Sequence, residues 1–114
     1  MVNLMINYYI AGAGGLGRVA YHILQERIRL DTQLSAMEAK ICGFLDDDFF
    51  ALSSFKDYPP VICGMSDYIP KATEQVIVAV GNPKVRRQIV KTLKKKIRHF
   101  PGLFIPKVFF TAHQ

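Results

Sequence analysis

The feature that most constrains this chain is the glycine-rich sequence Gly12-Ala13-Gly14-Gly15-Leu16-Gly17, because of what stands on either side of it. Before it, residues 4–10 form an apolar segment with the length of a buried strand. After it, apolar residues recur with the spacing of one helix face: Leu16, Val19, Ala20, Ile23 and Leu24. A G-x-G-x-x-G pattern is common by chance, but a strand before it and a helix after it are the context in which it binds phosphate. We therefore predict a strand, a phosphate-binding loop and a helix.

Three glycines of this loop have a mechanical role in that interpretation. Gly12 allows the tight turn out of the strand, Gly14 lets the backbone approach a diphosphate, and Gly17 lets the helix pack close to the sheet. The unpaired N–H groups and the positive dipole end of the helix attract the anion. The alternative is a glycine-rich turn that only joins the strand to the helix.

Length and composition favour a single domain, since the chain has 114 residues of which 50% are hydrophobic. Its longest apolar runs are shorter than the roughly 20 residues of a membrane span, and its N-terminus lacks the basic region of a signal peptide. We expect a cytoplasmic protein that does not bind a membrane. Cys42 and Cys63 lack a C-x-x-C spacing, so we expect them to be reduced and buried, without a metal.

Charge is distributed unevenly, because residues 75–114 carry nine basic side chains and no acidic one. Eight of the nine lie between Lys84 and Arg98. A cationic helix suits nucleic acid, an anionic membrane, an acidic partner or a phosphorylated ligand, whereas the simplest interpretation is a solvated helix face. Nucleic acid is disfavoured, because no stacking aromatic side chains alternate with the basic ones.

Four more segments have the residue types and lengths of buried strands: residues 41–45, 61–64, 76–80 and 103–105. The β-branched segment 76–80 is predicted at the centre of the sheet, and residues 49–60 are predicted to be a surface loop. Asn82 is suited to cap a second helix that begins at Pro83. This order predicts an α/β, Rossmann-like fold with a doubly wound, mainly parallel sheet of about five strands.

Right-handed crossovers bring the glycine loop, the acidic triplet that begins at Asp46, and Gly81-Asn82 to the same sheet edge. Ligands of such sheets bind beyond the carboxyl ends of the strands. Asp46 or Asp47 would accept hydrogen bonds from ribose hydroxyls, the alternative being a solvated turn. Arg18 would meet a phosphate or face water. No nucleophile and base, paired carboxylates or metal ligands are evident, so the sequence indicates binding without visible catalysis.

Three segments taken together resemble the N-terminal domain of bacterial sugar O-acyltransferases of the sialic acid O-acetyltransferase type, including the UDP-amino-sugar N-acetyltransferases. They are residues 11–19, 43–48 and 78–87, in the order of that family. The resemblance implies a Rossmann-like domain that holds a nucleotide sugar, commonly UDP-linked. It also implies that a C-terminal β-helix of hexapeptide repeats binds acetyl-CoA and carries the catalytic histidine.

By position, the resemblance implies roles for the loop glycines, for two aspartates and for the turn after residue 80. The glycines face the phosphates of the nucleotide sugar, and they are Gly12, Gly14, Gly15 and Gly17. Asp46 and Asp47 lie beside the uridine or the sugar, and Gly81 with Asn82 completes the crevice. Leu16 stands where the family usually has histidine, so a polar contact to the ligand is expected to be missing.

The transition into the β-helix is not recognisable in residues 104–109, and the sequence reaches Gln114 before any hexapeptide repeat. We assign residues 1–106 to the nucleotide-sugar-binding domain and residues 107–114 to an apolar tail at the start of a missing C-terminal region. Residues 108–110 suggest docking to a catalytic acyltransferase subunit or self-association through this tail.

The leading hypothesis is a UDP-sugar-binding domain of a sugar acyltransferase or acetyltransferase system in bacterial polysaccharide or glycan biosynthesis. We expect this domain to bind no cofactor and to be inactive alone, with acetyl-CoA needed only alongside a catalytic partner domain. The alternative is an NAD(P)-binding domain of an oxidoreductase or a redox-sensing regulator, which the glycine loop and the acidic strand end serve equally well. Against it, Asp46 lies beyond the spacing of about 20 residues in the NAD fingerprint.

Overall fold

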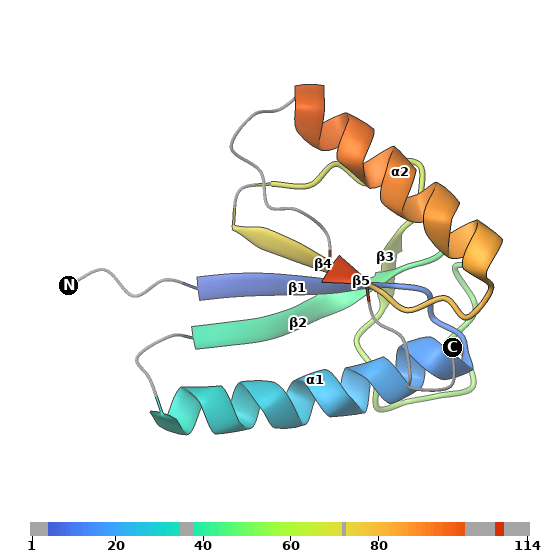
Figure 1. Cartoon of the computed structure of the whole chain (residues 1–114). Helices are drawn as coiled ribbons and strands as arrows, with labels where there is room; N and C mark the ends of the chain where they lie inside the picture. Colours follow the sequence, from blue (N-terminus) through green and yellow to red (C-terminus); the bar gives the residue numbers. More distant parts are fainter. Residues whose placement is uncertain (1–4, 35–37, 72, 100–106, 109–114) are drawn as a thin grey trace.

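The computed structural model describes residues 5–34, 38–71, 73–99 and 107–108. In chain order its elements are β1 (Met5–Ala11), α1 (Gly15–Leu34), β2 (Glu38–Leu45), β3 (Val61–Cys63), β4 (Glu74–Val78), α2 (Pro83–His99) and β5 (Lys107–Val108). The strands pair in parallel in the order β3-β2-β1-β4-β5, and the fifth has only two residues. α1 lies on one face of this sheet and α2 on the other (Figure 1). The predicted doubly wound, parallel α/β fold is confirmed.

The structure differs from the prediction in the position of its strands. β1 is the central strand, whereas β4 lies between β1 and the short edge strand β5, so the prediction that residues 76–80 form the centre is wrong. β-branched residues mark burial on both faces, and every inner strand of a doubly wound sheet has that property. The strand predicted at residues 103–105 lies outside the described residues. Lys107 and Val108, which we assigned to the tail, form β5, and the rest of that tail also lies outside the described residues.

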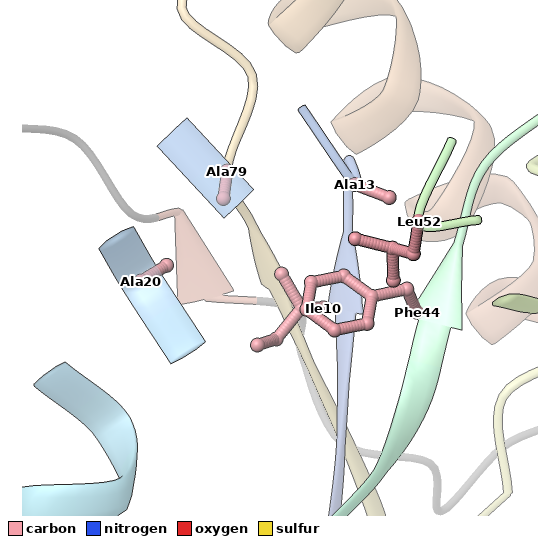
Figure 2. Close-up of a cluster of buried hydrophobic side chains, with 6 residues drawn as sticks. All are labelled: Ile10, Ala13, Ala20, Phe44, Leu52 and Ala79. Atoms are coloured by element: carbon pink, nitrogen blue, oxygen red, sulfur yellow. The ribbon is translucent and has the colours of Figure 1, made fainter. Parts of the chain in front are cut away.

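In the described part of the chain, two core clusters lie one on each face of the sheet, because successive strand residues point to opposite faces. Ile10 and Phe44 point to the α1 side, and Ala11 and Leu45 point to the α2 side. Figure 2 shows the cluster on the α1 side, which comprises Ile10, Ala13, Ala20, Phe44, Leu52 and Ala79. The cluster beneath α2 comprises Ala11, Leu45, Tyr68, Val76, Val78 and Leu93.

The connection between β2 and β3 contains turns and no helix, as predicted for residues 49–60. Aromatic side chains fix it to the first turns of α1. The rings of Tyr21 and Tyr58 lie edge to face with centroids 5.2 Å apart, and His22 Nε2 lies 2.9 Å from Tyr58 Oη. The guanidinium of Arg18 lies over the Phe55 ring, 4.1 Å from its centroid. This loop therefore covers the α1 side of the sheet near the glycine loop.

Cys42 and Cys63 are free thiols, but both are half-buried rather than buried as predicted. Cys42 lies in β2 and Cys63 in the three-residue strand β3. Neither helix in the described part of the chain is both long enough and apolar enough to cross a membrane.

Candidate functional site

Gly12 directly follows β1 and lies beside Leu45, at the end of β2, and Ala79, which follows β4. Its φ angle is +110°, and its N–H donates to the carbonyl oxygen of Leu45, 2.8 Å away. A Cβ at this position would lie 2.6 Å from the carbonyl oxygen of Ala79. Both the left-handed backbone and the close approach to Ala79 require glycine. The predicted tight turn out of the strand is therefore confirmed.

Gly17 brings the first turn of α1 against the glycine loop. A Cβ on Gly17 would lie 1.8 Å from the carbonyl oxygen of Gly12, so only glycine allows this approach. The predicted packing role of the third glycine is confirmed. Gly14 differs, because a Cβ there would meet no atom within 4 Å, and both Gly14 and Gly15 are exposed. An approach of a diphosphate to Gly14 remains a prediction.

Asp46 joins the end of β2 to the glycine loop. Its carboxylate oxygen Oδ2 accepts a hydrogen bond from the N–H of Ala13 at 2.8 Å, and Oδ1 accepts one from the N–H of Asp48 at 2.9 Å. Each oxygen retains a second acceptor site, since an ionised carboxylate can accept about four hydrogen bonds. Asp46 thus shapes the loop and can still accept a hydrogen bond from a ligand.

Asp47 makes the corresponding connection to the end of β3. Its Oδ1 accepts a hydrogen bond from the N–H of Met65 at 2.9 Å, and the residue is exposed. Lys96, on α2, donates from Nζ to the carbonyl oxygens of Ser66, at 2.7 Å, and of Tyr68. The turn that contains Met65 and Ser66 is therefore held from both sides.

Between this turn, the glycine loop and α2 lies a pocket of about 420 Å³. Three predicted site residues, Gly12, Asp46 and Asp47, contribute to its wall. The sequence interpretation missed the remaining wall residues, which are Met65, Ser66, Val80, Val85, Gln88, Ile89 and Thr92. The four on α2 recur with helical spacing, so they form one face of the helix. That spacing is the signal that could have found them.

The turn after β4 positions this face of α2. The side-chain oxygen Oδ1 of Asn82 accepts hydrogen bonds from the N–H groups of Lys84 at 3.0 Å and Val85 at 3.1 Å. Asn82 is thus the helix cap, as predicted. Gly81 and Asn82 are exposed and follow Val80 at the pocket wall, but neither is itself part of that wall.

Leu16 and Arg18 lie on the α1 side of the loop, away from the pocket wall. Leu16 packs against the core cluster beneath α1. Arg18 donates from Nη1 to the carbonyl oxygen of Ala13 at 3.3 Å, in addition to its contact with the Phe55 ring. The predicted site residues therefore divide between the two sides of the glycine loop.

Two tyrosines beneath α2 support the turn that lines the pocket. Tyr68 donates from Oη to Oε1 of Glu74 at 2.7 Å, and its ring lies 5.4 Å from that of Tyr9. Burial, and next the neighbouring Glu74 carboxylate, raise the pKa of the Tyr68 hydroxyl above its ordinary value. Burial and then Glu74 also raise the pKa of Tyr9, to about 12. Both hydroxyls are therefore protonated donors at neutral pH.

The wall of the pocket combines polar groups with apolar surface. Its wall offers two carboxylates, the Gln88 amide and the hydroxyls of Ser66 and Thr92, beside apolar surface from Val85 and Ile89. Among the described residues, no histidine, cysteine or lysine belongs to this wall. Within the described ranges, no three His, Cys, Asp or Glu side chains are grouped so that they could hold a metal ion. The pocket can accept hydrogen bonds from hydroxyl or N–H groups and cover a flat apolar group.

A sequence model described as the PglD N-terminal domain matches residues 7–93. The match extends from β1 into α2 and includes every residue of the pocket wall. It also includes all ten residues that the sequence predicts for the site. Comparisons with curated proteins and with solved structures gave no match.

Proposed function

Because this chain belongs to the PglD N-terminal domain family, we propose that it binds a nucleotide sugar, UDP-linked, in the pocket between the glycine loop and α2. The family relates the chain to the N-terminal domains of sugar acetyltransferases. We infer the ligand class from the pocket, whose position beyond the carboxyl ends of β1, β2 and β4 is the position of ligand sites in open α/β sheets.

The observation that carries the proposal is the pairing of two carboxylates with an apolar helix face in one pocket. Asp46 and Asp47 offer acceptors to ribose hydroxyls or to the N–H of a uracil ring. Val85 and Ile89 offer the surface on which that ring can lie. The volume of about 420 Å³ falls within the range of small-molecule sites. A uridine is a ligand that uses both kinds of surface.

The diphosphate is proposed to lie over the exposed part of the loop, at Gly14 and Gly15. The first intrahelical bond of α1 runs from the N–H of Arg18 to the carbonyl oxygen of Gly14, at 3.0 Å. The N–H groups before Arg18 therefore begin the helix without intrahelical partners, and they attract an anion together with the helix dipole. The open space around Gly14 supports this placement.

We propose that the isolated chain does not transfer acetyl groups. The described residues of the pocket wall include no histidine to act as a base, and His22 lies on the α1 side against Tyr58. Acetyl-CoA and the catalytic base would come from a separate catalytic domain or subunit, in a system for bacterial polysaccharide or glycan biosynthesis. Turnover of acetyl-CoA with a UDP-amino sugar by the purified chain would overturn this part of the proposal.

Calorimetric titration with UDP tests the binding proposal, since UDP is the part shared by all UDP-linked sugars. We expect saturable binding of UDP and no saturable binding of NADH. Val85→Asp, which places a charge in the pocket wall beside two carboxylates, should weaken UDP binding about tenfold or more. Val19→Asp is the matched control, because Val19 is a similarly exposed valine on α1 and should leave UDP affinity unchanged. Equal loss in both variants would contradict the proposed site.

A further inference from the structure

α1 carries an exposed apolar stripe that belongs to neither core cluster. Its members are Val19, Ile23, Leu30 and Leu34, and Leu34 is 85% exposed. At 100° per residue these four positions project within a narrow sector of the helix, so they lie on one face, with Glu26 and Arg27 between the two apolar pairs. Single exposed apolar residues are ordinary, whereas several on one helix face mark an interaction surface.

The stripe continues into an apolar groove between α1 and the sheet. This groove has a volume of about 330 Å³, and it is lined by Ala20, Ile23, Leu24, Glu26, Arg27, Leu30 and Ile77. Ile77 belongs to β4, and α2 lies on the opposite face of that strand (Figure 1). The stripe and the groove thus make one surface.

The side chains along the stripe are complementary to those of a second, antiparallel copy of the same helix. Its midpoint lies between Glu26 and Arg27. A second α1 that runs antiparallel about a twofold axis through this midpoint would place Val19 against Leu34 and Ile23 against Leu30. The same axis would place Glu26 against Arg27 of the other copy. Every facing pair is then apolar with apolar or acidic with basic.

We propose that a second copy of this chain covers this surface, in a twofold dimer formed by antiparallel α1 helices. Residues 19, 23 and 27 form one i+4 row and residues 26, 30 and 34 form another, and the twofold axis exchanges these rows. A parallel arrangement is disfavoured, because it would place Glu26 against Glu26 and Arg27 against Arg27.

The charges at the axis form a network in this dimer. Glu26 pairs with Arg29 of its own helix through contacts to both Nε and Nη2, and Arg27 Nε lies 3.5 Å from Asp31 Oδ2. The UDP pocket lies on the α2 side of the sheet, so both pockets of the dimer stay open. The dimer therefore does not depend on the proposed ligand.

Sedimentation velocity of the full chain over a range of concentrations tests the proposal. We expect a concentration-dependent dimer whose dissociation constant rises about tenfold or more in Ile23→Glu. Ile69→Glu is the matched control, because Ile69 is 52% exposed against 53% for Ile23 and lies outside α1. Circular dichroism of each variant separates loss of the dimer from loss of the fold, and the control should remain dimeric.

Charge exchange tests the register without removing apolar surface. Glu26→Arg alone and Arg27→Glu alone each place like charges across the axis and should weaken the dimer. The double variant Glu26→Arg/Arg27→Glu should dimerise more strongly than either single variant, although it loses the pairs within each helix. A chain that stays monomeric at its highest soluble concentration, a dimer unaffected by Ile23→Glu, or no recovery in the double variant would overturn the proposal.

Discussion

The glycine loop separates two regions of the molecule: side chains fill the space on its α1 side, whereas a pocket lies on its α2 side. On the α1 side, Arg18, Phe55 and Tyr58 close the space beside the loop by contacts with one another and with α1. On the α2 side, the loop borders a pocket of about 420 Å³. A glycine motif therefore predicts the sheet edge of a ligand site, whereas the neighbouring loops decide on which side of that edge there is a pocket.

The largest effect is expected at Gly17, which supports both sides. In Gly17→Ala the added Cβ would have to lie 1.8 Å from the carbonyl oxygen of Gly12, so α1 must move away from the loop. We expect a loss of about 3 kcal/mol or more in the free energy of unfolding, measured by urea denaturation. Gly14→Ala is the control, with a change within about 0.5 kcal/mol, because its Cβ meets open space. Equal stability of the two variants would contradict the packing role of Gly17.

The next effect is expected at Asp46, which links the loop to β2. Asp46→Ala leaves the N–H groups of Ala13 and Asp48 without their acceptor, and should cost about 1–3 kcal/mol of unfolding free energy as well as UDP affinity. Asp47→Ala removes one acceptor at an exposed position and should cost less stability. Urea denaturation at neutral pH measures both. If Asp47→Ala proves the more destabilising, the bridging role assigned to Asp46 is wrong.

A pair of variants separates the two sides more directly. Phe55→Ala removes the ring beneath Arg18 and should lower stability by about 0.5–1 kcal/mol without changing UDP affinity. Gln88→Leu should leave stability nearly unchanged and weaken UDP binding by about 3- to 10-fold, which is the contribution of one hydrogen bond. Urea denaturation and calorimetry on both proteins provide the four values. If either variant lowered both the stability and the UDP affinity, the two sides of the loop would not be independent.

The smallest effect is expected in the pH dependence of stability. Burial and then Glu74 raise the pKa of Tyr68, and the pKa of Tyr9 rises to about 12. The folded state therefore holds these protons more tightly than the unfolded state, in which tyrosine titrates near about 10. The contribution of these two hydroxyls to the free energy of unfolding is fully present below that pH. It is lost as the pH rises toward their pKa values in the folded state. Urea denaturation at a series of pH values from neutral to alkaline should show that the free energy of unfolding declines less steeply with pH for Tyr68→Phe than for the wild type. An identical decline would contradict this assignment.

Local rules predicted the parts of the site that depend on neighbouring residues in the sequence. The turn at Gly12, the close packing at Gly17 and the cap at Asn82 each follow from a backbone requirement that few residue types meet. The order of the elements also sufficed for the doubly wound sheet, since right-handed crossovers leave few alternatives.

The rest of the site depends on contacts between distant segments. The hydrogen bond from Ala13 to Asp46 joins residues 33 positions apart, and no local pattern specifies it. The pocket lies on the α2 side of the glycine loop, because the loop around Tyr58 packs against α1 and fills the space on the other side. Val85 and Ile89 belong to the pocket wall, and Ile89 also packs against the cluster beneath α2, so helical periodicity alone does not separate wall residues from core residues.

The most direct test of the account is an NMR titration of the isotopically labelled chain with UDP, in which backbone amide shifts report where the ligand lies. We predict saturable shifts at Gly12, Met65 and Gln88 on the α2 side, with little change at His22 and Tyr58 on the α1 side. Saturable shifts confined to the α1 side, or saturation by NADH with no response to UDP, would contradict the proposed nucleotide-sugar site.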